Sequence, residues 1–218
     1  MVKKVILIFA FLIGLVAVAL YNLSLPLLRR LPKPTWVSTG GITTIDDAIS
    51  ACRKSGLQGW DLVEYARHLV SRKMVYSRLN TWDSYSRAFE RGRGYCEQQA
   101  LSLNAIYQKL GIESRVVFAM RCKFPPQIID GFPWSGGVSG HSWVRVRIGS
   151  EELDICPGST ENKPGKINFE ILSKVHTLRP WLRPITHFGS SVENIRRDTL
   201  ARHSSFISVN KKLQPVLV

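Results

Sequence analysis

The pattern of apolar and polar positions divides the chain into helical segments followed by strands. Thr44, with Asp47 three residues later, has the pattern of a capping box and predicts a helix over 44–53. Apolar residues then recur at helical spacing over 60–73, which predicts a second helix. The stretch 74–93 is polar with scattered aromatic residues, and we expect a loop with helical turns there.

A third helix is predicted to begin near Cys96. An amphipathic stretch over 100–110 follows this residue, and Gly111 is suited to the position just after a helix. Beyond it, the Val- and Phe-rich segment 114–120 predicts a strand. The segment 121–139 contains three prolines and three glycines, so we expect a long loop.

Alternation of polar and apolar residues predicts a hairpin further along the chain. Its first strand runs over 141–148. Gly149 and Ser150 then offer a two-residue turn into a returning strand over 151–156. Helices that precede an antiparallel sheet define an α+β fold. The pattern weakens afterwards, although a helix over about 192–201 is expected.

The N-terminus has the pattern of a membrane-targeting segment. Residues 5–20 are apolar or small, carry no charge and follow Lys3 and Lys4. We expect 1–30 to form an uncleaved anchor, that is, a transmembrane helix. The alternative is a cleaved signal peptide with a small-x-small site at 17–19.

The rest of the chain divides into three parts. A Pro- and Gly-marked linker is expected over 31–43, the main folded domain over 44–160, and a C-terminal extension over 161–218 that packs on the domain or is partly flexible. The N-terminal segment predicts that the domain is tethered outside the cytoplasm, or secreted if the segment is cleaved.

The charge of the chain limits the classes of binding partner that we expect. The sequence has 30 basic and 16 acidic residues, for a formal net charge of +14, and they are spread without a block of five basic residues. No zinc-finger spacing or interleaving of basic and aromatic residues accompanies this charge, so nucleic acid is not an expected partner. An anionic envelope polymer or membrane surface suits it better.

Cys96 is the clearest candidate for chemistry. Glycines loosen the chain just before it and a helix is predicted just after it, so the thiol should lie in the first helical turn. The positive end of a helix stabilises a thiolate and can lower a cysteine pKa by about one to several units. His141, 45 residues later, opens the alternating strand and is a candidate base.

The other cysteines are Cys52, Cys122 and Cys156, and they form no paired CxxC spacing typical of zinc or redox sites. The chain also lacks an acidic cluster with calcium-loop spacing, so we expect no metal and no cofactor. Cys122 and Cys156 each end a predicted strand and are the candidate disulfide pair. Otherwise, these residues are small buried apolar side chains.

The order of these motifs resembles the transglutaminase-like superfamily, which shares its core with papain-like cysteine proteases. The matching residues are 94–96 at the cysteine, 110–117 through the next strand, 141–146 at the histidine and 153–154 in the returning strand. The resemblance spans about 60–158 and favours a membrane-anchored member of bacterial type.

This resemblance implies a triad of Cys96 as nucleophile, His141 as general base and acid, and Asp154 as the carboxylate that orients the imidazole. Asp154 would face Arg145 if the turn is tight, about 13 Å along the strand from His141, so a bulge or looser turn is needed. At a wider spacing, Cys156 would take the carboxylate position.

The expected oxyanion donors are the backbone N–H of Cys96 and a side chain, with Trp82 the first candidate and Trp60 and Gln98 behind it. Trp143 shares a face with His141 and either walls the site or belongs to the core.

The implied function is acyl transfer on an amide of a peptide or protein substrate. Hydrolysis is favoured over cross-linking, because the chain lacks the extra domains of large transglutaminases. The alternative is a non-catalytic transglutaminase-like module that binds ligands at the cell envelope.

Overall fold

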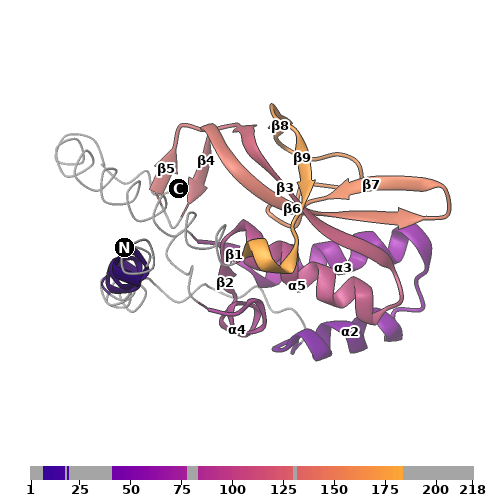
Figure 1. The fold of residues 1–218 in the computed structure, drawn as a ribbon. Helices are drawn as coiled ribbons and strands as arrows, with labels where there is room; N and C mark the ends of the chain where they lie inside the picture. The colour runs from indigo at the N-terminus through magenta and orange to yellow at the C-terminus, as the bar shows by residue number, and fades with distance from the viewer. Residues whose placement is uncertain (1–6, 18, 20–40, 78–82, 130–131, 184–218) are drawn as a thin grey trace, which may run out of the picture.

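A computed structural model of the 218-residue chain describes residues 7–17, 19, 41–77, 83–129 and 132–183. The helices between residues 45 and 109 lie together against one side of an antiparallel sheet (Figure 1). Residues 7–17 and 19 are helical. Among the described residues, no helix combines the length and hydropathy needed to span a membrane. The helix expected over 192–201 lies outside the described residues.

The first two predicted helices are confirmed. Helix α2 covers Ile45–Lys54 and α3 covers Gly59–Lys73. The capping box is present, because the Asp47 N–H donates to Thr44 Oγ1 over 3.1 Å and the Thr44 N–H donates to Asp47 Oδ2 over 2.7 Å. These bonds satisfy backbone donors that the first helical turn leaves without partners.

The stretch between α3 and the cysteine is more ordered than the predicted loop. Its described part contains α4 (Tyr85–Arg91) and two short parallel strands, β1 (Val75–Tyr76) and β2 (Arg93–Gly94). Gly92 ends α4 with a left-handed φ of 71°, which glycine adopts without strain. Strand β2 then leads directly into α5 (Cys96–Lys109).

The main sheet is antiparallel, and its strands follow the order β7-β6-β3-β8, with β9 also paired to β3. The strands are β3 (Glu113–Phe124), β6 (Gly137–Ile148), β7 (Glu151–Ile155), β8 (Glu170–Ile171) and β9 (Val175–Thr177). A short 3-10 helix covers Pro180–Leu182.

The long loop predicted over 121–139 is wrong. Strand β3 continues past a register shift to pair Phe124 with Gly137, and the described part of the segment between them forms a hairpin of β4 (Gln127–Ile129) and β5 (Phe132–Trp134). The prolines misled the prediction because they sit in this peripheral hairpin and its approach, where no central ladder bond is lost.

Alternate residues of β6 divide between two apolar cores. Val144 and Val146 pack with the helices in the larger core, whereas Trp143 packs with Cys122 and Phe169 in a smaller one. This division follows from the two-residue period of a strand. His141 has the same parity as Trp143, so the candidate base lies beside the smaller core.

Candidate active site

Cys96 is the first residue of α5, where the chain turns from β2 into the helix. Gln98 holds this turn: its Oε1 accepts the Tyr95 N–H over 3.0 Å, and its Nε2 donates to the Asp83 carbonyl over 2.7 Å. Cys96 as a whole residue is half-buried, although its sulfur lies on the buried side. The backbone N–H of Ser142, the residue after His141, lies close enough to stabilise its anion.

The pKa of Cys96 does not follow the prediction from its helix position. Burial raises the pKa of its thiol to about 12, although the backbone N–H groups of Ser142 and Glu97 act in the opposite direction. The Glu97 carboxylate, which is itself buried, adds like-charge repulsion. Loss of hydration therefore outweighs the helix terminus, and the resting residue is a neutral thiol.

The imidazole of His141 lies among aromatic rings. Its centroid is 4.6 Å from that of Phe169, 5.0 Å from that of Phe124 and 6.0 Å from that of Trp143, which stacks on it. Burial lowers the pKa of His141 to about 3. The imidazole is therefore neutral at pH 7, with a lone pair that can accept a proton.

These two pKa directions predict how Cys96 reacts with a neutral alkylating agent. We expect the rate with iodoacetamide to rise about tenfold per pH unit between pH 6 and 9, because a neutral thiol forms thiolate in proportion to hydroxide. The measurement is peptide mapping by mass spectrometry after timed alkylation. A rate that is flat with pH over this range would indicate a preformed thiolate–imidazolium pair and contradict the prediction.

Asp154 does not take the predicted place beside His141. Arg145 Nε donates to its Oδ1 over 2.7 Å and Arg145 Nη2 to its Oδ2 over 3.1 Å. The cause is the tight turn: Ile148 pairs with Glu151, which sets Arg145 opposite Asp154, as the sequence predicted for that turn. No bulge corrects this register, so Asp154 stays with the arginine, four residues along β6 from His141.

Cys156 is the side chain that meets the imidazole. Its Sγ lies 3.3 Å from His141 Nε2 and accepts the Gly158 N–H over 3.4 Å. Burial raises the pKa of this thiol to about 12. The sequence offered one indication of this contact. At the wider spacing between the histidine and the third triad residue, Cys156 occupies the third position.

The predicted hydrogen-bond donors to the oxyanion fall into three groups. The backbone N–H of Cys96 begins α5, where helix geometry leaves it without an intrahelical partner. Trp82 lies outside the described residues. Trp60 packs against the larger core, and the Gln98 amide is engaged in the turn before α5, so both have structural roles.

The four cysteines are free thiols, so the predicted Cys122–Cys156 disulfide is not formed. Cys52 and Cys122 are buried, and burial raises the pKa of each to about 11. Among the described residues, no group of three His, Cys, Asp or Glu side chains could hold a metal ion.

A pocket opens beside His141 and Cys156. Aromatic side chains line much of it, and the amide side chains of Gln127 and Asn168 supply hydrogen-bonding groups; the aromatic residues are Tyr76, Phe124 and Trp134. The described residues of its lining include no Asp, Glu, Lys or Arg. The pocket therefore suits an uncharged segment of a ligand, even though the chain is strongly basic.

Part of the chain is similar to known proteins. A family model described as the transglutaminase-like superfamily matches residues 49–154. A solved structure described as "Crystal structure of a TGase" is 17% identical, with a TM-score of 0.36, and the match covers 56% of this chain and 34% of that chain. No curated protein matches the sequence. By this family match, the part of the chain over residues 49–154 belongs to the transglutaminase-like superfamily.

Proposed function

We propose that this protein is a cysteine-dependent acyl-transfer enzyme that hydrolyses peptide or amide bonds outside the cytoplasm. One observation carries the proposal: the Cys96 thiol, at the start of α5, lies against the backbone of Ser142. Ser142 is the next residue in the chain after His141, which is buried and neutral. The extracytoplasmic location rests on the charge-free apolar segment after Lys3 and Lys4.

The first half-reaction forms a thioester. His141 takes the proton from Cys96 while the sulfur attacks the carbonyl carbon of the amide, and the developing oxyanion accepts the backbone N–H of Cys96. The C–N bond then breaks, and the imidazolium gives its proton to the leaving amine. The acyl group remains on the sulfur, and His141 returns to its neutral form.

The second half-reaction releases the acyl group. His141 accepts a proton from water as the oxygen attacks the thioester carbon, the C–S bond breaks, and Cys96 recovers its proton from the imidazolium. The products are a carboxylic acid and the free thiol. If an amine replaces water, the same sequence of steps gives a new amide and cross-links two molecules.

A second candidate function is a non-catalytic module that binds an uncharged peptide segment at the cell envelope. It is favoured by a specific observation: the side chain against His141 is a thiol rather than a carboxylate. In that case, the pocket beside His141 would bind the ligand and Cys96 would form no acyl adduct.

Mass spectrometry of the acyl-enzyme tests the proposal. The full chain is incubated with a short peptide thioester as acyl donor, and we expect an adduct on Cys96 that hydroxylamine removes. Cys52 and Cys122 are internal controls, because both are buried free thiols. No adduct, or equal adducts on all cysteines, would contradict the enzyme proposal and favour the binding module.

The same experiment in heavy-oxygen water separates hydrolysis from transfer. Hydrolysis places the heavy isotope in the released acid. An added primary amine that diverts most of the acyl group into a new amide would instead assign cross-linking.

A further inference from the structure

The Cys156 sulfur contacts two nitrogen atoms, and one of them is an obligate hydrogen-bond donor. The Gly158 N–H donates to Cys156 Sγ over 3.4 Å, and a peptide N–H can act only as a donor, so the sulfur is an acceptor in this place. His141 Nε2 lies 3.3 Å from the same sulfur. When Nε2 carries the ring proton, the sulfur accepts it as a second hydrogen bond.

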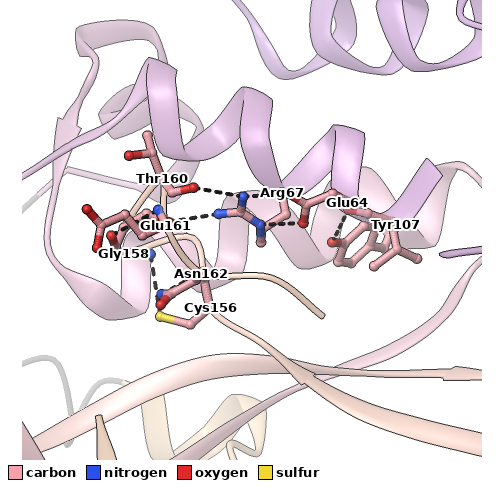
Figure 2. A network of polar contacts seen from close by, with 10 residues as sticks. Glu64, Arg67, Tyr107, Cys156, Gly158, Thr160, Glu161 and Asn162 are labelled. Carbon is pink, nitrogen blue, oxygen red and sulfur yellow. Dashed lines mark hydrogen bonds and ion pairs between the residues drawn. The ribbon is translucent and has the colours of Figure 1, made fainter. Parts of the chain in front are cut away.

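The loop that carries Cys156 is fastened by buried polar groups (Figure 2). Asn162 Nδ2 donates to the Cys156 carbonyl over 3.1 Å, and Asn162 Oδ1 accepts the Asn168 N–H over 2.9 Å. Asn162 is 1% exposed, so these bonds are shielded from water. Without these hydrogen bonds, the desolvated amide of Asn162 would destabilise the folded state.

Arg67 joins this loop to helix α3. Its guanidinium is fully buried and donates to the carbonyls of Ser159 and Thr160 over 2.8 and 3.3 Å. Glu64 neutralises it through two hydrogen bonds of 2.7 Å (Figure 2). A chain segment more than 90 positions away from α3 is thereby held in one place, and Cys156 with it.

We propose that Cys156 is a positioning residue that holds the proton of His141 on Nε2 and leaves Nδ1 to take the proton of Cys96. The proposal rests on the proposed function, and it goes further because it assigns the third position to a thiol. A histidine can serve as a base only through the nitrogen that lacks a proton. The tautomer therefore decides whether His141 can activate Cys96.

A thiol in this position acts differently from a carboxylate. It accepts a hydrogen bond without bringing a negative charge, so it orients the ring but stabilises the imidazolium weakly. The titratable or charged side chains that act on Cys156 directly are Arg67 on α3 and Cys122 on β3, and Cys156 itself acts on Cys96 on α5; the carboxylates Glu64 and Glu97 act instead on Arg67 and Cys96. No carboxylate acts on His141 itself, which is consistent with its low pKa.

Two variants disturb the contact in different ways. Cys156→Ala removes the sulfur. Gly158→Ala keeps it but adds a Cβ only 3.3 Å from Cys156 Sγ and 3.8 Å from Gln99 Oε1, so the sulfur must move. The backbone of Gly158 is in a conformation that alanine can adopt, so the substitution should displace the Cys156 side chain without straining the backbone. If Cys156→Ala does not fold, Gly158→Ala tests the contact alone.

The readout is nitrogen NMR of histidine-labelled full-length protein, with the His141 signals identified by their loss in His141→Gln. We expect the Nε2-protonated tautomer in the natural protein and a mixture of tautomers in Cys156→Ala and Gly158→Ala. The rate at which Cys96 forms an acyl adduct with the peptide thioester at pH 8 should fall about tenfold in both variants, because this step uses His141 as the base.

Cys156→Asp tests the same role from the opposite direction. A carboxylate against Nε2 favours the imidazolium and raises the pKa of His141. We expect the alkylation rate of Cys96 at pH 6 to increase at least tenfold, because the thiolate then has a cationic partner. A variant that only damaged packing would not produce this gain.

Cys122→Ala is the matched control, since Cys122 is a buried free thiol in the same small core. It should leave the tautomer and the rates of acyl-adduct formation and alkylation unchanged. The proposal is overturned if Cys156→Ala and Gly158→Ala keep the natural tautomer, or if Cys122→Ala alters it equally. The tautomer requires no acyl transfer, so a protein that forms no acyl adduct but shows these NMR changes contradicts the proposed function alone.

Discussion

Replacing Cys96 with alanine should lower the rate of acyl-enzyme formation and of substrate turnover by about 10⁴-fold or more. Loss of a covalent nucleophile removes the thioester route, and only binding and oxyanion stabilisation remain. The residue is half-buried at the start of α5, and alanine removes only one sulfur atom from it, so the fold should persist. The measurement is the hydroxylamine-sensitive adduct and the turnover of the same peptide thioester.

Cys52→Ala provides the matched control for this loss. Cys52 is a buried free thiol on α2 in the larger core, remote in its contacts from His141 and Cys156. It should change turnover by less than about twofold, apart from any loss of folded protein. If Cys96→Ala retained a tenth of the natural turnover, another group would be the nucleophile.

Local signals in the sequence predicted much of the fold. The capping box at Thr44 and Asp47 lies within one turn of chain, and the helical periodicity of α3 records a single buried face. The pairing of Arg145 with Asp154 was also accessible, because a two-residue turn sets the register of both strands. In each case, the decisive interaction joins residues that are close in sequence.

Other features depend on contacts between distant segments and were missed. The pKa of Cys96 is an example: its helix position is local, but the burial that raises the pKa to about 12 depends on segments distant in sequence, and Ser142 of β6 lies beside the thiol. The contact of Cys156 with His141 is another, because it requires a loop that Arg67 holds from α3. A sequence pattern contains the residues of such a site but not the desolvation or the path of the chain that bring them together.

The small core beside His141 makes Trp143 the residue with the largest expected effect on stability. Its side chain is fully buried, packs on Phe169 with centroids 5.4 Å apart, and stacks on His141. Trp143→Ala should lower the free energy of unfolding by about 4 kcal/mol, through lost burial and the cavity that remains. Urea denaturation followed by circular dichroism measures this change.

Two further substitutions at tryptophans are the controls for this prediction. Trp181→Ala should change stability by less than about 0.5 kcal/mol, because Trp181 is 64% exposed. Trp143→Phe keeps an aromatic ring against Phe169 and removes an indole N–H that has no partner among the described residues. Its cost should therefore stay below about 2 kcal/mol, since the smaller cavity is offset by the loss of an unsatisfied donor. A loss below about 1 kcal/mol in Trp143→Ala would mean that this core does not support the β6 face that carries His141.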